Sequence, residues 1–117
     1  MTAWAPLRDE QFCYLTTTGR VTGRPHRIEI WFGIDGATLY MLSGGRDRSD
    51  WVKNLRKTPS VTVEIGSTVF SGRARIVDRP DEDERARQLL HAKYGRSGRD
   101  LSSWRRSSLP VAVDLLE

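Results

Sequence analysis

Hydrophobic and polar residues alternate along much of the chain, and this pattern predicts short β-strands. The clearest case is residues 25–34, where one face is apolar and the other holds two charged residues and a tryptophan. The two faces hold Ile28, Ile30 and Phe32 on one side and Arg27, Glu29 and Trp31 on the other. The Asp35-Gly36 pair that follows is a strong hairpin signal, so residues 37–43 are expected to return as the next strand.

Four further segments have the composition of strands, because they are rich in β-branched and aromatic residues. They are residues 12–18, 60–65, 68–77 and 110–116. Gly66-Ser67 joins the second and third of them as another hairpin. The sequence therefore predicts six strands, connected mostly by tight turns.

Helix signals occupy two of the longer connections. Ser49 is a suitable N-cap for a helix over residues 50–57, and a Thr-Pro pair lies just beyond its end. Pro80 begins a second helix with acidic residues in its first turn, where the helix dipole favours them, and Gly95 ends it. A third short segment surrounds Trp104, before the last strand.

Six strands with two or three short helices predict a mainly β fold, most simply a small antiparallel barrel. An open sheet with a helix on one face is the alternative. The chain has 117 residues, of which 38% are hydrophobic, and this suits a single domain over residues 1–117.

The lone cysteine and the shortness of the apolar runs bear on where the protein works. Cys13 can form no internal disulfide and no cysteine-based metal site, and it is expected to be a buried, unreactive thiol. The longest apolar run spans only a few residues, which predicts no membrane span, and the first ten residues lack the order of a signal peptide. We therefore expect a cytoplasmic protein.

The charge balance is basic and is dominated by arginine. Nineteen Lys and Arg residues against fifteen Asp and Glu residues give a net charge of +4, and only three of the nineteen are lysines. The planar guanidinium group suits phosphate and carboxylate, so an anionic partner is expected, with an ordinary solvated basic surface as the alternative. Aromatic residues are not interleaved with the basic ones, which argues against nucleic acid.

Recognised catalytic motifs are not found in the sequence. There is no HExxH, CxxC or nucleophile-elbow pattern, so no catalytic residue and no metal ligand is assigned. The two histidines, His26 and His91, lie far apart in the chain, and His91 is expected on the solvated face of the second helix.

Two segments combine glycines with arginines in a way that favours anion binding. Residues 19–27 place Arg20, Arg24, His26 and Arg27 around a strand-to-strand turn. Residues 43–51 place a glycine pair and two arginines just before a helix N-terminus, which itself favours anions. The two segments can form opposite walls of one cleft, with an ordinary basic hairpin as the alternative. Neither matches GxGxxG or the Walker pattern.

Residues 15–32 and 43–66 together resemble the deazaflavin-dependent nitroreductase family. The resemblance rests on TTTGR-x-[ST]-G-x-P, followed by a helix that reads W-x-x-N-L and ends in P-x-V-x-V, and it is good over residues 12–77. That family belongs to the split β-barrel flavin-binding superfamily, which also includes the pyridoxamine-phosphate-oxidase-like proteins. The resemblance implies a split β-barrel, a homodimer, and coenzyme F-420, an 8-hydroxy-5-deazaflavin with a phosphodiester and an oligoglutamate tail.

The resemblance and the charge argument together assign nineteen residues to the cofactor. They are Arg20, Val21, Thr22, Arg24, His26, Arg27, Ile28, Glu29, Ile30, Trp31, Met41, Leu42, Ser43, Gly44, Asp50, Trp51, Val52, Lys53 and Asn54. Trp31 is expected near the ring or the substrate, or else as a hydrophobic plug, and Trp51 is the more core-like of the two. Family members often have a lysine directly after the serine of the second motif, where this chain has Gly44.

The implied activity is transfer of a hydride between reduced coenzyme F-420 and a small organic acceptor, such as a quinone, a nitro compound or an enone. Since the cofactor itself transfers the hydride, a chain without an obvious acid–base pair can still be an enzyme. An FMN-dependent reductase or oxidase on the same barrel and a non-enzymatic cofactor-binding protein are the alternatives. Most tyrosines that line the substrate pocket in the nitroreductase branch are missing, and only Tyr94 lies nearby.

Overall fold

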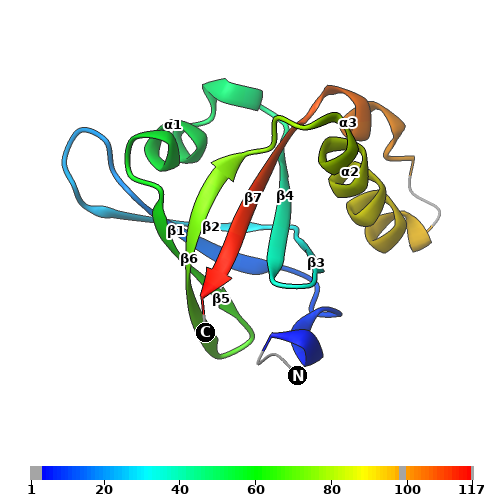
Figure 1. Ribbon diagram of the computed structural model, residues 1–117, viewed down its shortest axis with the longest axis horizontal. Helices are drawn as coiled ribbons and strands as arrows, with labels where there is room; N and C mark the ends of the chain where they lie inside the picture. Colours follow the sequence, from blue (N-terminus) through cyan, green and yellow to red (C-terminus); the bar gives the residue numbers. More distant parts are fainter. Residues whose placement is uncertain (1–3, 98–99, 117) are drawn as a thin grey trace.

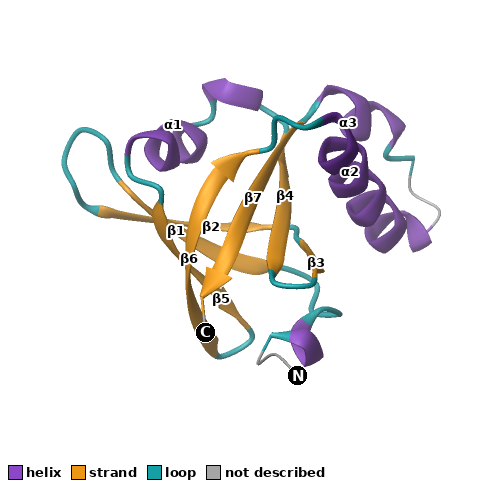
Figure 2. Cartoon of the chain, viewed as in Figure 1, coloured by secondary structure: helices purple, strands orange, loops and turns teal. Residues whose placement is uncertain are grey.

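Seven strands and three helices are present in the computed structural model, which describes residues 4–97 and 100–116 (Figure 1, Figure 2). The strands are β1 (Cys13–Thr18), β2 (Pro25–Ile30), β3 (Gly33–Asp35), β4 (Thr38–Ser43), β5 (Ser60–Ile65), β6 (Thr68–Ile76) and β7 (Leu109–Leu116). The helices are α1 (Asp50–Lys57), α2 (Pro80–Tyr94) and α3 (Ser102–Ser107). The predicted domain over residues 1–117 also includes residues 1–3, 98–99 and 117, which lie outside the described residues.

The described strands form one antiparallel sheet in the order β2-β1-β5-β6-β7-β4-β3. Its two edge strands, β2 and β3, are consecutive in the chain and are separated only by Trp31 and Phe32. Three Cα steps reach at most about 11 Å, so the sheet must curl until its two edges approach each other. Because those edges do not pair, the result is a split barrel, which confirms the predicted fold class.

The prediction of one strand over residues 25–34 was wrong, because the structure has two strands there and seven in all. The chain leaves one edge of the sheet at Ile30 and joins the other edge at Gly33. At the break, the Phe32 N–H donates to the Tyr94 hydroxyl at 2.9 Å, and that hydroxyl lies 3.0 Å from the Phe32 carbonyl oxygen. A side chain from α2 therefore replaces the strand partners of this residue.

Strand β4 lies between two hydrophobic cores. Leu39 and Met41 face the barrel interior, whereas Tyr40 and Leu42 face the core under α2. Because both faces of β4 are covered, its sequence is a nearly continuous apolar run and does not alternate between apolar and polar residues. The second core holds α2 and α3 beside β4, while α1 lies on the other side of the barrel, near the β1–β2 turn (Figure 1).

The predicted helix boundaries agree with the structure. The first helix occupies Asp50–Lys57, and the second begins at Pro80 and ends where Gly95 follows it. Over residues 4–97 and 100–116, no helix combines the length and the apolar character needed to cross a bilayer.

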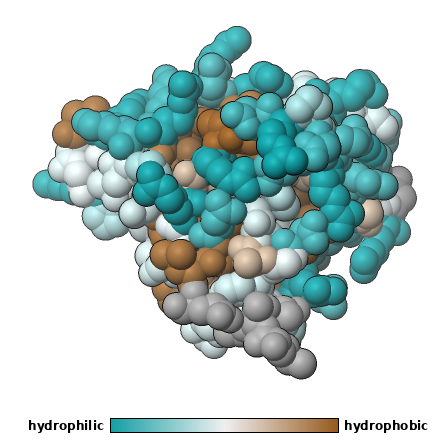
Figure 3. All heavy atoms as spheres, viewed as in Figure 1, coloured by the Kyte–Doolittle hydropathy of each residue, from teal (hydrophilic) through white to brown (hydrophobic). Residues whose placement is uncertain are grey.

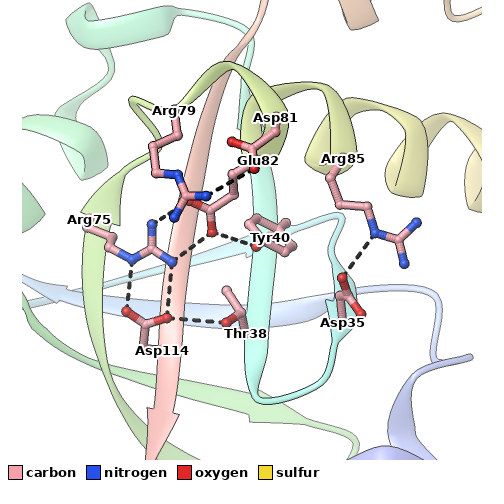
Figure 4. Close-up of polar contacts among 9 residues, drawn as sticks. All are labelled: Asp35, Thr38, Tyr40, Arg75, Arg79, Asp81, Glu82, Arg85 and Asp114. Carbon is pink, nitrogen blue, oxygen red and sulfur yellow. Dashed lines mark hydrogen bonds and ion pairs between the residues drawn. The ribbon is translucent and has the colours of Figure 1, made fainter.

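Ion pairs fasten the beginning of α2 to the sheet (Figure 4). The Arg75 guanidinium donates to both Glu82 carboxylate oxygens at 2.8 Å, and its Nε donates to Asp114 at 2.8 Å. The Tyr40 hydroxyl donates to Glu82 at 2.6 Å. Arg75 and Tyr40 hold the pKa of Glu82 down to about 2, while burial and the bond to Glu82 raise the pKa of Tyr40 to about 12. We call Arg75, Glu82, Asp114 and Tyr40 the α2 clamp.

Candidate functional site

A hollow of about 220 Å³ lies between the β1–β2 turn and the N-terminal half of α1. Its lining residues are Gly19, Arg20, Val21, Thr22, His26, Asp50 and Asn54, all but the first predicted as cofactor ligands. We call it the turn–α1 hollow. The structure thus brings together six of the predicted residues, from two segments of the chain about thirty residues apart.

Glycines shape the turn that forms one wall of this hollow. Gly19 donates its N–H to the Arg24 carbonyl at 2.8 Å, and Gly23 has a φ of +75°, which disfavours other residues. A Cβ added at Gly19 would lie 2.6 Å from His26 Nε2, so the imidazole packs on a bare backbone. The turn therefore needs glycine at both positions, and the tip between them leaves Val21 88% exposed.

Arg20 connects the turn to α1. Its guanidinium donates to Asp50 Oδ1 at 3.1 Å and to Asn54 Oδ1 at 3.0 Å, and its backbone N–H also donates to Asn54. Asn54 is buried and donates in turn to Thr17 Oγ1 at 3.2 Å, while Lys57 donates to the Arg20 carbonyl. The Arg20 side chain remains 33% exposed and its partner Asp50 is 85% exposed, so an anion entering the hollow can replace that exposed carboxylate.

The N-terminus of α1 has no side-chain cap. Ser49 occupies the N-cap position with extended backbone, but its hydroxyl hydrogen-bonds to the Ser43 hydroxyl at 2.9 Å. Ser49 is therefore the N-cap residue, as predicted, but its side chain makes no capping hydrogen bond. Uncapped first-turn amides beside Arg20 and the exposed Arg24 offer N–H donors to a phosphate or carboxylate, so the hollow suits an anionic group.

The loop between β4 and α1 uses its polar groups largely for its own structure. Ser43 is 1% exposed and donates to the Arg46 carbonyl at 2.8 Å. Arg46 adopts a left-handed φ of 55°, and its guanidinium donates to the Ser107 carbonyl at 2.8 Å, at the end of α3. Gly44 is exposed with open space around the position of a Cβ, whereas a Cβ at Gly45 would lie 2.5 Å from the Ser49 hydroxyl.

Several of the predicted ligands lie away from the hollow. Arg27 pairs with Glu64 at 3.1 Å on the outer face of the sheet, since side chains alternate along β2 and Arg27 points opposite to His26. Met41 and Val52 are fully buried in the barrel core, and Trp51 packs against that core. Lys53 is exposed on α1.

A second hollow, of about 250 Å³, lies at the other end of β2. It is lined by Glu29, Ile30, Trp31, Leu42 and Trp104, and we call it the tryptophan hollow. The Trp31 and Trp104 rings meet edge to face, 5.6 Å apart between centroids and 83° between planes. Sequence reasoning had not assigned Trp104, although a lone tryptophan in the polar segment SSWRRS was an available signal.

The two hollows share strand β2. His26 lines the first and Ile30 lines the second, and four residues of extended chain span about 13 Å. Between them, Ile28 and Ile30 lie half-buried against the barrel core and give this stretch an apolar floor. The strand therefore joins a polar hollow suited to anions with an aromatic hollow suited to a flat ring.

Titratable side chains away from the hollows are engaged in structure. Burial raises the pKa of the Cys13 thiol to about 12, as expected for an inert core cysteine, and raises that of Tyr94 to about 12. Burial lowers the pKa of Lys93 to about 8. His91, expected on the solvated face of the second helix, is half-buried and accepts a hydrogen bond from Arg105 at 3.0 Å.

Comparison with known proteins supports one family. A family model described as F420H(2)-dependent quinone reductase matches residues 4–116. The chain is 29% identical over 105 residues to an F420H(2)-dependent quinone reductase of Mycobacterium tuberculosis, and the match covers 87% of this chain and 70% of that protein.

Solved structures share the fold. A conserved hypothetical protein of Mycobacterium tuberculosis matches with a TM-score of 0.77 at 19% identity, over 100% of this chain and 82% of that one. A structure described as an F420-H2 dependent reductase matches with a TM-score of 0.69 at 20% identity, over 88% of this chain and 93% of that one. At these identities the likeness concerns the split-barrel fold.

Proposed function

The chain belongs to the F420H(2)-dependent quinone reductase family, and from this premise we propose that it reduces a small quinone. Membership makes the protein an oxidoreductase with coenzyme F-420 as its cofactor, which confirms those two predictions. Among the predicted acceptors, the family description favours quinones over nitro compounds and enones. The expected cytoplasmic location remains a prediction.

The observation that carries the proposal is that a polar hollow beside Arg20 and an aromatic hollow lie along one strand. We assign the anionic tail of the cofactor to the turn–α1 hollow, where Arg20 and the uncapped amides of α1 would hold phosphate or carboxylate. The exposed Arg24 at the rim adds positive charge. Arg27 is left out of this proposal because it lies on the opposite face of the sheet.

The stretch of β2 between the hollows would hold the ring system. Ile28 and Ile30 provide an apolar surface that excludes water from one face of a flat ligand. When bound, the reduced deazaflavin supplies the hydride, and solvent supplies the proton that completes the hydroquinone. Trp31 and Trp104 would orient the quinone in the tryptophan hollow, so the chain contributes mainly proximity and orientation.

A homodimer is also proposed. The outer surface of β1, β5 and β6 has a hollow of about 360 Å³ lined mostly by threonine, serine and glycine, with Leu116 at its rim. Val69 and Leu116 are 62% and 58% exposed, and burying them is favourable for a chain of this size. Figure 3 shows apolar side chains (brown) among polar ones on one face of the molecule. Light scattering should give twice the chain mass, and a monomer at high micromolar concentration contradicts the proposal.

Titration and turnover test the proposed activity together. Purified protein should quench or shift the fluorescence of coenzyme F-420 at micromolar concentration and bind FMN much more weakly. With reduced coenzyme, menadione should be reduced, as followed by the return of the oxidised-cofactor absorbance. Equal or tighter FMN binding, or cofactor binding without quinone reduction, would overturn the assignment of the acceptor or of the site.

A further inference from the structure

The indole of Trp31 is held flat by the ring behind it. The Tyr94 ring stacks on Trp31 with centroids 4.2 Å apart and planes 4° apart. Tyr94 is 5% exposed in the core under α2, whereas Trp31 is half-buried and lines the tryptophan hollow. One face of the indole thus rests on a fixed ring while the tryptophan still reaches the hollow.

The hydroxyl of Tyr94 fixes the backbone next to that indole. It accepts from the Phe32 N–H at 2.9 Å and lies 3.0 Å from the Phe32 carbonyl and 2.9 Å from the Gln11 carbonyl. The neighbouring Lys93 donates to the Phe32 carbonyl at 3.0 Å and lies 3.7 Å above the Phe32 ring. Two consecutive residues of α2 therefore hydrogen-bond to the backbone at the break between β2 and β3, one residue after Trp31.

Trp31 and Trp104 together form a right-angled corner of two indoles, with 83° between their planes. A flat acceptor in that corner can lie face-on against one ring and edge-on against the other, which are the two preferred aromatic geometries. A bulky or puckered acceptor can satisfy only one of them. The corner exists only while Trp31 keeps its plane.

We infer that Tyr94 is a positioning residue, which through Trp31 makes the tryptophan hollow selective for flat aromatic quinones. The inference rests on the proposed function for the identity of the acceptor. Tyr94 does not touch the acceptor; it sets the plane of the indole that does. A purely structural tyrosine would affect folding stability but would have no particular effect on quinone affinity.

Tyr40 offers a matched control for Tyr94. It is also 5% exposed, belongs to the same core under α2, and has a hydroxyl that donates to Glu82. It does not line the tryptophan hollow. Tyr40→Phe and Tyr94→Phe thus remove the same group from the same core, and only the second change lies behind Trp31.

The experiment compares the two variants with menadione as the probe. Tyr94→Phe should raise the KM for menadione about fivefold, with kcat and the Kd of coenzyme F-420 changed by less than about twofold, because it removes the hydroxyl that fixes the Phe32 backbone next to the Trp31 indole. Tyr40→Phe should leave that KM unchanged. Quenching of tryptophan fluorescence by menadione in the absence of cofactor should weaken in the same order. This readout separates failure of the inference from failure of the proposed activity.

A double-mutant cycle tests whether Tyr94 acts through Trp31. Trp31→Leu alone should raise the menadione KM and weaken quenching. In that background Tyr94→Phe should add nothing to either effect, because the indole through which Tyr94 acts is absent. Two results would show that Tyr94 serves only the core. In the first, Tyr94→Phe changes the menadione KM and the quenching no more than Tyr40→Phe does. In the second, Tyr94→Phe has the same effect with Trp31→Leu present as without it.

Discussion

Replacing Glu82 by glutamine tests whether the α2 clamp holds the helix onto the sheet. Glu82 receives both guanidinium nitrogens of Arg75 and the Tyr40 hydroxyl, and its side chain is 17% exposed. Lowering its pKa from 4.5 to about 2 corresponds, without solvent screening, to about 3 kcal/mol of unfolding free energy. Arg75 is 40% exposed, so solvent screening reduces this to about 1–2 kcal/mol of unfolding free energy.

The pH dependence follows from the sign of the shift. The folded-state pKa of Glu82 lies below its unfolded value, so the contribution is complete above about pH 4.5 and is lost as the pH falls towards 2. Urea unfolding followed by circular dichroism should therefore show a constant difference between wild type and Glu82→Gln from pH 7 to pH 5. The difference should shrink steadily between pH 4.5 and pH 3.

Asp81 supplies the control for this measurement. It precedes Glu82 in the first turn of α2, so both carboxylates interact with the same helix dipole. Its ion pair with Arg79 leaves both side chains 72% exposed (Figure 4). Asp81→Asn should change stability little. If Glu82→Gln costs no more than Asp81→Asn, or costs as much at pH 3 as at pH 7, the clamp does not stabilise the fold as argued.

Three further outcomes are expected from the described contacts. Arg20→Ala should weaken binding of coenzyme F-420 by about 1–3 kcal/mol and reduce its salt dependence, whereas Arg27→Ala, on the outer face, should change neither in a fluorescence titration. Gly44→Val should impair cofactor binding with little effect on melting temperature, whereas Gly45→Val should also destabilise the loop, since its Cβ meets Ser49. Cys13 should react with a thiol reagent only after unfolding, because it is fully buried with its pKa raised to about 12.

Most strands and the two longer helices could be predicted because their signals are local. A Pro at the start of α2, a Thr-Pro pair after α1 and turn glycines between strands act within a few residues. The break between β2 and β3 has no such signal, because alternation continues through Trp31 and Phe32. Its cause is the Tyr94 hydroxyl, 62 residues away in the chain, which takes over the backbone groups of Phe32.

The sequence predicted the part of the candidate site in which arginines lie close to a glycine-containing turn. The sequence placed Arg20 and Arg27 in one basic cluster, but the β1–β2 register sends their side chains to different places. Likewise, Trp31 was recognised as a candidate while its partner Trp104 was not. Their contact joins the residue after β2 to a short helix more than seventy residues later, and periodicity within either segment cannot reveal it.

The position of the split also explains why one end of β2 is polar and the other is aromatic. At its beginning, β2 is joined to β1 by an exposed turn. Among the described side-chain hydrogen bonds, those that connect this turn to α1 all involve Arg20, and one of them comes from Lys57. At its end, the chain crosses from one sheet edge to the other in two residues, and side chains of α2 replace the missing strand pairing. In the proposed function, the polar end would therefore hold the ligand tail, whereas the aromatic residues that close the barrel would shape the acceptor end. Substitutions at Trp31 or Trp104 should accordingly change the choice of acceptor while leaving cofactor affinity in place.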